Sequence, residues 1–269
     1  MHPILFTIFG KAIYTYGFMA MLGLLAAVGT WYWLARRETQ YGGDFPTTFA
    51  IWLMLPGIVG ARAAYVIANW SYFSTHASEI IRTDHGGLIF YGGFIAAFLA
   101  LVICAKVRRF PLLALCDFAV PALAIGHAFG RLGCLMFGCC HGSPITCADG
   151  LYARLFGLVY PLETPMGHQF PDIPLHPVQV YETAGLLLLW AGLLLFRRRL
   201  VRHPGLSSAL YLLCYAPLRF GLEFLRGDTR QSGLCGLNVA QTVSIGLFMA
   251  GVALLFFVLA RPTPERADS

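Results

Sequence analysis

The chain has 269 residues, of which 58% are hydrophobic and only 12% are charged, and its mean hydropathy is +0.67. Soluble globular proteins carry roughly 25% charged residues, so this composition excludes an ordinary soluble domain and indicates a membrane protein. The net charge of +6 does not call for a nucleic-acid partner, because basic residues in cytoplasmic loops orient membrane helices.

Seven apolar segments follow one another, and each is long enough to cross the hydrocarbon region of a bilayer. They cover residues 13–35, 46–69, 87–105, 111–136, 177–196, 207–225 and 237–260. The expected fold class is therefore all-α integral membrane, with seven transmembrane helices in a single membrane domain over residues 1–269. The start of the chain lacks the basic region and cleavage site of a signal peptide, so we interpret it as part of a retained first helix.

The basic residues between these segments are unevenly distributed. If the N-terminus is outside, the cytoplasmic connections and tail hold eleven of them: Arg36, Arg37, Lys106, Arg108, Arg109, Arg197, Arg198, Arg199, Arg202, Arg261 and Arg266. The outer connections hold five: Lys11, Arg82, Arg154, Arg226 and Arg230. This excess predicts that the N-terminus is outside and that the C-terminal tail, about 261–269, is cytoplasmic. Arg62, Arg131 and Arg219 lie within or at the ends of spans, which makes them candidate functional residues.

The longest stretch without apolar character runs over about residues 138–176 and contains five prolines. It is too long for a plain connection, and loops of this length are often functional. With the orientation above it is expected to form a small extracytoplasmic cap.

The sixth segment contains Arg219, Glu223 and Arg226 at positions i, i+4 and i+7, which share one face of a helix. Arg219 and Glu223 could simply neutralise one another inside the bundle. However, two arginines around one carboxylate leave an excess of positive charge, which suits a phosphate group.

Arg131 lies among glycines near the end of the fourth segment, in GHAFGRLGCLMFGCCHG. Glycines alone favour close helix packing, but a guanidinium beside exposed backbone N–H groups indicates an anion site. His127, one turn earlier, is interpreted as a buried and hydrogen-bonded histidine. Glu182, early in the fifth segment, is interpreted as a partner of the helix dipole.

Two Gly-Gly pairs precede and open the third segment, in DHGGLIFYGGFIAA. Such pairs would let the backbone bend around a ligand. Tyr91 could donate a hydrogen bond or relay a proton, or it could be an aromatic residue of the membrane interface. His85, in the preceding loop, is the other candidate for proton transfer.

Eight cysteines raise the question of a metal or disulfide framework. Cys104, Cys116 and Cys214 fall in apolar stretches, where a thiol acts as a small hydrophobe. The adjacent residues Cys139, Cys140 and His141, with Cys147 nearby, lack the spaced pairs of usual zinc sites, so no metal ligand is predicted. A disulfide on the outer side remains open.

Taken together, these segments resemble the bacterial prolipoprotein diacylglyceryl transferases. The resemblance covers most of the chain and is carried by IYTYGFMAMLG, GARAAYV, GGLIFYGGFI, GRLGCLMFGCCHG, HPVQVYE, RFGLEFLR and LNVAQTVSIG. The sequence departs from the best-known members at Tyr91, where a histidine is expected, and at Cys134, where an asparagine is common. The first departure weakens any mechanism that needs a histidine base at that position.

The resemblance implies a set of site residues. Catalytic roles are expected for Arg131, Arg219, Glu223 and Tyr91. Substrate-binding roles are expected for Tyr16, Cys134, Gly142 and Arg226. Arg62 and His85, which the residue patterns above single out, are added to the expected substrate-binding residues.

The activity implied by the resemblance is transfer of the diacylglyceryl group of phosphatidylglycerol to the lipobox cysteine of a prolipoprotein signal peptide, with release of glycerol phosphate. This would be the first step of bacterial lipoprotein maturation, and the reaction needs no metal or organic cofactor. The implied location is the bacterial inner membrane, among membrane lipids, with the active site toward the periplasm. The alternatives are a diverged member with another acceptor and a lipid or anion transporter, against which the lack of internal repeats argues.

Overall fold

A computed structural model describes residues 1–8, 11–82, 87–145, 150–227 and 236–261. The chain forms two compact units, one of residues 1–30 with 119–269 and the other of residues 31–118. The boundaries between the units fall inside two helices, Thr15–Ala35 and Leu112–Phe137. A single membrane domain over the whole chain remains a prediction.

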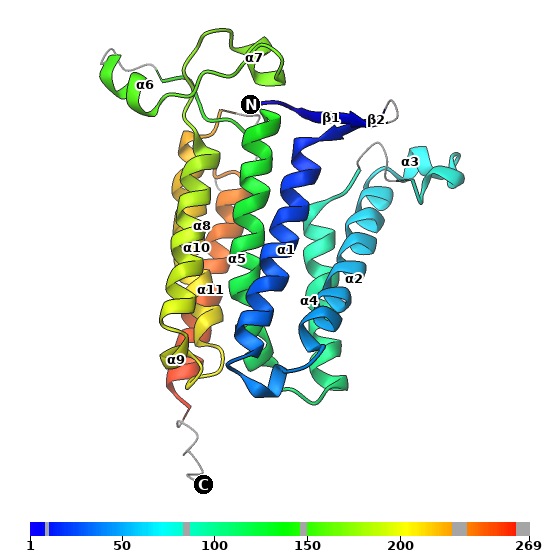
Figure 1. Cartoon of the computed structure of the whole chain (residues 1–269), viewed down its shortest axis with the longest axis vertical. Coiled ribbons are helices and arrows are strands. Elements are labelled where there is room, and N and C mark those ends of the chain that lie inside the picture. The colour runs from blue at the N-terminus through cyan, green and yellow to red at the C-terminus, as the bar shows by residue number, and fades with distance from the viewer. Residues whose placement is uncertain (9–10, 83–86, 146–149, 228–235, 262–269) are drawn as a thin grey trace. The chain divides into compact units, whose positions relative to one another are not determined.

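Seven main helices correspond to the seven expected segments (Figure 1). They are α1 (Thr15–Ala35), α2 (Phe45–Ala68), α4 (Phe90–Val107), α5 (Leu112–Phe137), α8 (Val178–Leu195), α10 (Leu206–Leu222) and α11 (Val239–Leu259). Within the described residues, all of these except α10 are long and apolar enough to span a membrane. The helix α10 has 17 residues, and the 3₁₀ turn η3 (Glu223–Leu225) continues its path to the end of the predicted segment. The all-α membrane fold class is therefore confirmed.

Short elements lie between the main helices. They are η1 (Thr39–Tyr41), α3 (Trp70–Phe73), η2 (Ala77–Glu79), α6 (Gly150–Phe156), α7 (Pro165–Gln169) and α9 (Arg197–Leu200). An antiparallel hairpin of β1 (Ile4–Ile8) and β2 (Lys11–Tyr14) precedes α1. The interpretation of the chain start as part of the first helix is wrong for these residues. β-Branched and aromatic side chains dominate them and favour extended backbone.

In the unit of residues 31–118, α2 and α4 pack with their backbones very close together. A Cβ atom placed on Gly60 would lie 2.7 Å from the Gly92 carbonyl oxygen, and one on Gly92 would lie 2.6 Å from the Gly60 carbonyl oxygen. Small residues allow such close approach. In a lipid bilayer, where the hydrophobic effect does not drive helices together, close packing of this kind stabilises their association. Gly92 and its neighbour Gly93 therefore allow close helix packing here. From the sequence, this glycine pair was expected to let the backbone bend around a ligand.

This contact predicts a stability effect. Gly60→Ala should lower the free energy of unfolding by about 1–3 kcal/mol, because the new methyl group meets a backbone carbonyl that cannot move aside cheaply. The matched control is Gly246→Ala in α11, where an added Cβ meets no atom within 4 Å. Thermal unfolding of both purified variants in detergent measures the difference. Equal midpoints for the two variants would contradict this account of α2 and α4.

In the unit of residues 1–30 and 119–269, α8 and α11 both pack against α10 (Figure 1). The helix α11 begins with a capping box, in which Asn238 and Gln241 each accept a hydrogen bond from the other's backbone N–H group. This cap satisfies N–H groups that would otherwise be unpaired at the helix start. It also fixes Asn238 next to the end of α10, where the candidate site lies.

The expected cap over about 138–176 lies at one end of α5 and α8 and includes α6 and α7 (Figure 1). Isolated β-bridges join Leu175 to Pro144 and to Leu158. Its side relative to a membrane remains a prediction.

Candidate functional site

An ion pair joins two helices in the middle of the candidate site. Arg131 projects from α5, and its Nε atom lies 2.9 Å from Oε2 of Glu182 in α8. The Glu182 side chain is only 3% exposed, so the pair is held away from bulk solvent. His127 Nε2 lies 3.6 Å from the other carboxylate oxygen, and the Tyr215 hydroxyl from α10 donates a hydrogen bond to it at 3.3 Å. Glu182 is therefore the common partner of three side chains.

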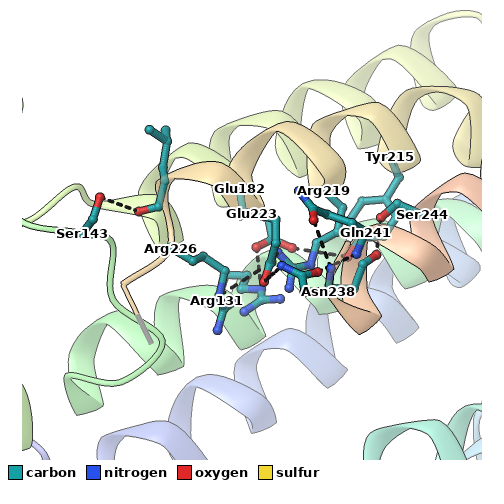
Figure 2. A network of polar contacts seen from close by, with 12 residues as sticks. Arg131, Ser143, Glu182, Tyr215, Arg219, Glu223, Arg226, Asn238, Gln241 and Ser244 are labelled. Atoms are coloured by element: carbon teal, nitrogen blue, oxygen red, sulfur yellow. Dashed lines mark hydrogen bonds and ion pairs between the residues drawn. The ribbon is translucent and has the colours of Figure 1, made fainter. Parts of the chain in front are cut away.

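A second carboxylate organises the end of α10. Glu223 Oε2 lies 2.5 Å from Arg219 Nη1 and 3.8 Å from Arg226 Nε, and its other oxygen accepts a hydrogen bond from Asn238 at 3.1 Å. The i, i+4 spacing predicted from the sequence thus brings Arg219 and Glu223 together, and η3 tightens the helix so that Arg226 faces the same carboxylate. Figure 2 shows these side chains gathering at one level of the helices.

The two clusters together carry an excess of positive charge. Arg131, Arg219 and Arg226 contribute three positive charges, and Glu182 and Glu223 contribute two negative ones, which leaves one positive charge when His127 is neutral. The three arginine side chains are 10–15% exposed. Charges this well buried interact strongly, because the surroundings are less polarisable than water. The arrangement suits one bound anion, and a guanidinium pairs well with phosphate oxygens.

Gly142 lies where two segments of the cap meet the chain that follows η3. Its N–H group donates to the His176 carbonyl at 3.1 Å, and it forms a β-bridge with Arg226. A Cβ on Gly142 would collide with the backbone of His176, and one on Gly227 would lie 2.6 Å from the Gly142 carbonyl oxygen. Only glycine permits this packing, which holds the backbone of Arg226 against the cap.

The cap is also fastened to α8 through Gln179. Its Nε2 atom donates to the Cys139 carbonyl at 2.7 Å and to the Tyr160 hydroxyl at 2.8 Å. Burial raises the pKa of Tyr160 to about 12, so this hydroxyl stays protonated near neutral pH. The link fixes the turn after α5, which carries the glycine motif.

Tyr16 and Cys134 lie near this turn. The Tyr16 ring lies against Gly133 of α5, where an added Cβ would be 3.0 Å from a ring carbon. Cys134 is in the last turns of α5 and lies within electrostatic reach of Arg131. The structure therefore brings seven of the expected site residues into one unit: Tyr16, Arg131, Cys134, Gly142, Arg219, Glu223 and Arg226.

The other three expected residues belong to the unit of residues 31–118 or lie outside the described residues. Tyr91, in the first turn of α4, is half exposed. Arg62 donates hydrogen bonds to the backbone carbonyls of Glu79, Ile80 and Gly87, at 2.7, 2.8 and 3.1 Å, and so fastens that loop. It also lines a cavity of about 400 Å³ with Tyr65 and Tyr72 among others. His85 is not among the described residues.

Sequence reasoning missed the main partner of Arg131. Glu182 was assigned only to the helix dipole, although it is the one acidic residue of the segment 177–196. A carboxylate within an apolar span needs a partner from another helix, and that rule would have linked it to Arg131. Asn238 was also missed. The sequence Asn-Val-Ala-Gln at 238–241 is a capping signal that would have placed Asn238 at a helix start.

Comparison with known proteins identifies the family of the chain. The chain matches the family model described as prolipoprotein diacylglyceryl transferase over residues 3–257. A Clostridium perfringens protein named phosphatidylglycerol–prolipoprotein diacylglyceryl transferase 2 is 34% identical over 264 residues, covering 94% of each chain. Proteins of the same name, without the numeral, from Dehalococcoides mccartyi and Trichormus variabilis are 31% and 33% identical, covering 99% of this chain and 96% and 94% of their own lengths. The chain belongs to the prolipoprotein diacylglyceryl transferase family.

Proposed function

We propose that this protein transfers the diacylglyceryl group of phosphatidylglycerol to the lipobox cysteine of prolipoproteins. The observation that carries the proposal is the cluster of Arg131, Arg219 and Arg226 around two buried carboxylates, which leaves one positive charge for an anionic head group. Family membership supports the reaction, since the relatives are named for this donor and acceptor.

In this reaction the acceptor sulfur attacks the glyceryl carbon that bears the phosphate. A carbon–sulfur bond forms, and the bond between that carbon and the phosphate oxygen breaks. The bonding electrons leave with glycerol phosphate, and the proton of the thiol is taken up by a base or by the departing phosphate. Only a few per cent of a free thiol is ionised at neutral pH, so the site must assist this proton loss.

Arg131 and Arg219 would bind the phosphate oxygens, on which negative charge grows as the bond breaks. A guanidinium can hold two such oxygens at once, which fixes the direction in which the leaving group departs. Glu182 and Glu223 would act as positioning residues, because each contacts an arginine within ion-pair distance. The part of the site that binds the lipid donor would be lined by Tyr16, Cys134 and Gly142. Arg226 would add a third positive charge there.

Tyr91 and His85 remain the two candidates for proton transfer. If the Tyr91 hydroxyl relays the proton, Tyr91→Phe should lower kcat by about 10²-fold or more while KM for the lipid stays unchanged, as for loss of a general acid or base. Tyr14→Phe, a half-exposed tyrosine outside the main helices, is the matched control. A loss smaller than about fivefold would move the role to His85 or to a bound water.

The protein would lie in the bacterial inner membrane, with the cap and the arginine site toward the periplasm. In intact cells, an impermeant thiol reagent should then label Glu163→Cys, in the cap, and should label Val201→Cys only after the cells are permeabilised. Both positions are exposed in the structure. The experiment uses a background in which the native cysteines of 134–147 and Cys235 are replaced by serine, so that no native thiol expected on the outer side reacts with the reagent. Labelling of Val201→Cys alone in intact cells would reverse the orientation.

The direct test is incubation of the purified protein with phosphatidylglycerol and a lipobox peptide, followed by mass spectrometry of the peptide. The expected product is a peptide whose cysteine carries one diacylglyceryl group. Addition to a peptide with serine at that position should not occur. Movement of labelled lipid or anion across vesicles without any covalent product would favour a transporter instead.

A further inference from the structure

Three thiols lie together just beyond the arginine site, and the proposed reaction uses none of them as a nucleophile. Cys134 is in the last turns of α5, and Cys139 and Cys140 follow the end of that helix. Their sulfur atoms all lie within 4.8 Å of one another, each residue is partly exposed, and none is in a disulfide. Among the described residues this is the group of His, Cys, Asp and Glu side chains that could hold a metal ion.

The backbone brings these thiols together by reversing over the end of α5. The N–H groups of Gly138 and Cys139 both donate to the Cys134 carbonyl at 3.0 Å, and Gly138 has a φ of 77°. Cys140 has a φ of 60°, a left-handed conformation that is uncommon for residues other than glycine. Such strain persists only where the surrounding structure enforces it, and it is often found at functional sites. The turn thus folds Cys139 and Cys140 back toward Cys134.

The spacing of the sulfur atoms fits metal coordination. A zinc ion lies about 2.3 Å from each thiolate, so tetrahedral geometry places two sulfurs about 3.8 Å apart. The observed upper limit of 4.8 Å requires a contraction of about 1 Å at most. Rotation of the side chains can supply this movement, because all three residues are partly exposed.

Two positively charged side chains of the candidate site lie next to the cluster. The guanidinium groups of Arg226 and Arg131 both act electrostatically on the Cys140 sulfur. Three thiolates and one divalent ion carry a net charge of −1, which the neighbouring arginines would offset. Nearby cations are the usual setting in which cysteines become reactive or bind metals.

We propose that Cys134, Cys139 and Cys140 form a site for one thiophilic divalent metal ion, such as Zn²⁺, with a fourth coordination position open to water. Binding would release the thiol protons to solvent. The sequence argument against a metal considered the cluster formed by Cys139, Cys140, His141 and Cys147. The third ligand comes instead from Cys134, one turn before the end of α5, where the reversal of the chain brings it back into contact.

The test is a titration of the purified, metal-free full chain with Cd²⁺, under a reductant without thiols, followed by the ultraviolet charge-transfer absorption of cadmium thiolates. The expected result is one ion per chain with the intensity of three thiolates, displaced by Zn²⁺. Cys134→Ser, Cys139→Ser and Cys140→Ser should each weaken binding by at least about tenfold, since even changes in residues that only support metal ligands cost 10–100-fold. Matched controls are Cys116→Ser and Cys214→Ser, which should bind as the unchanged protein does.

Cys147→Ser and Cys235→Ser variants are titrated in parallel, to test whether either of the two cysteines outside the described residues is a metal ligand. Loss of the absorption in either of them, or unchanged binding in Cys140→Ser, would overturn the proposal. A measurement on the unchanged protein covers the case in which a variant does not fold. Zn²⁺ should protect residues 134, 139 and 140 from maleimide alkylation, as read by peptide mass spectrometry, and equal alkylation of these three with and without Zn²⁺ would also overturn it.

Discussion

Arg131→Lys and Arg219→Lys are each expected to lower kcat/KM by about 10²-fold or more, although both keep the positive charge. Loss of one donor that stabilises developing negative charge costs about 10²–10³-fold in other enzymes. Lysine supplies a point charge on a flexible stem, and it cannot make two parallel hydrogen bonds to a phosphate or to a carboxylate. In the structure each guanidinium contacts a carboxylate within 3 Å, so the remaining nitrogen atoms are directed by that contact.

The measurement is initial velocity against phosphatidylglycerol at saturating peptide, with Arg154→Lys in α6 as a control outside the charge cluster. Glu223→Gln should keep more activity than Glu223→Ala, because the amide can still orient Arg219, whereas equal loss in both would assign proton transfer to Glu223. Near-normal rates in both lysine variants would make the arginines structural ion-pair partners only.

Glu182→Ala is expected to lower the free energy of unfolding by about 3–5 kcal/mol. It leaves the Arg131 charge buried without its partner, and removing one member of a buried ion pair typically has this cost. It also removes the acceptor of the Tyr215 hydroxyl group. Thermal unfolding in detergent measures the effect, with Glu163→Ala as the control because that carboxylate is exposed.

A double change separates stability from catalysis at this pair. Replacing a buried ion pair by apolar residues of similar size is often neutral or stabilising. Arg131→Met with Glu182→Leu should therefore recover most of the stability lost in Glu182→Ala while activity stays absent. Recovery of activity in the double variant would show that the pair only holds the fold together. Failure to recover stability would show that Glu182 contributes mainly through His127 and Tyr215.

The fold was predictable because each span is a long, predominantly apolar segment, and in a membrane such segments have to be helical to satisfy their own backbone groups. The hairpin before α1 was not predicted. Its residues are as apolar as those of the helix, so hydropathy alone does not separate them, and only their β-branched and aromatic character does.

Part of the site was predictable for a local reason. Arg219 and Glu223 are four residues apart at the end of α10, so their spacing alone predicts that they meet. The prediction that Arg226 continues the same helical face is wrong, because the helix ends before it and Arg226 has extended backbone beyond η3. The contacts of Arg131 with Glu182, of Glu223 with Asn238, and of Cys134 with Cys140 depend on how helices pack or how a chain end turns. The sequence holds only indirect signs of these, such as a single carboxylate in an apolar span, a capping pattern and a glycine after a helix.

The central claim is that the arginine cluster drives transfer of the diacylglyceryl group to a thiol with loss of glycerol phosphate. The most direct measurement is a single-turnover reaction in which labelled glycerol phosphate and lipidated peptide are counted in the same samples, for the unchanged protein and for Arg131→Lys. The account predicts equal amounts of the two products at every time point, and a rate at least about 10²-fold lower in the variant. Release of glycerol phosphate without lipidated peptide, or equal rates in the two proteins, would contradict it.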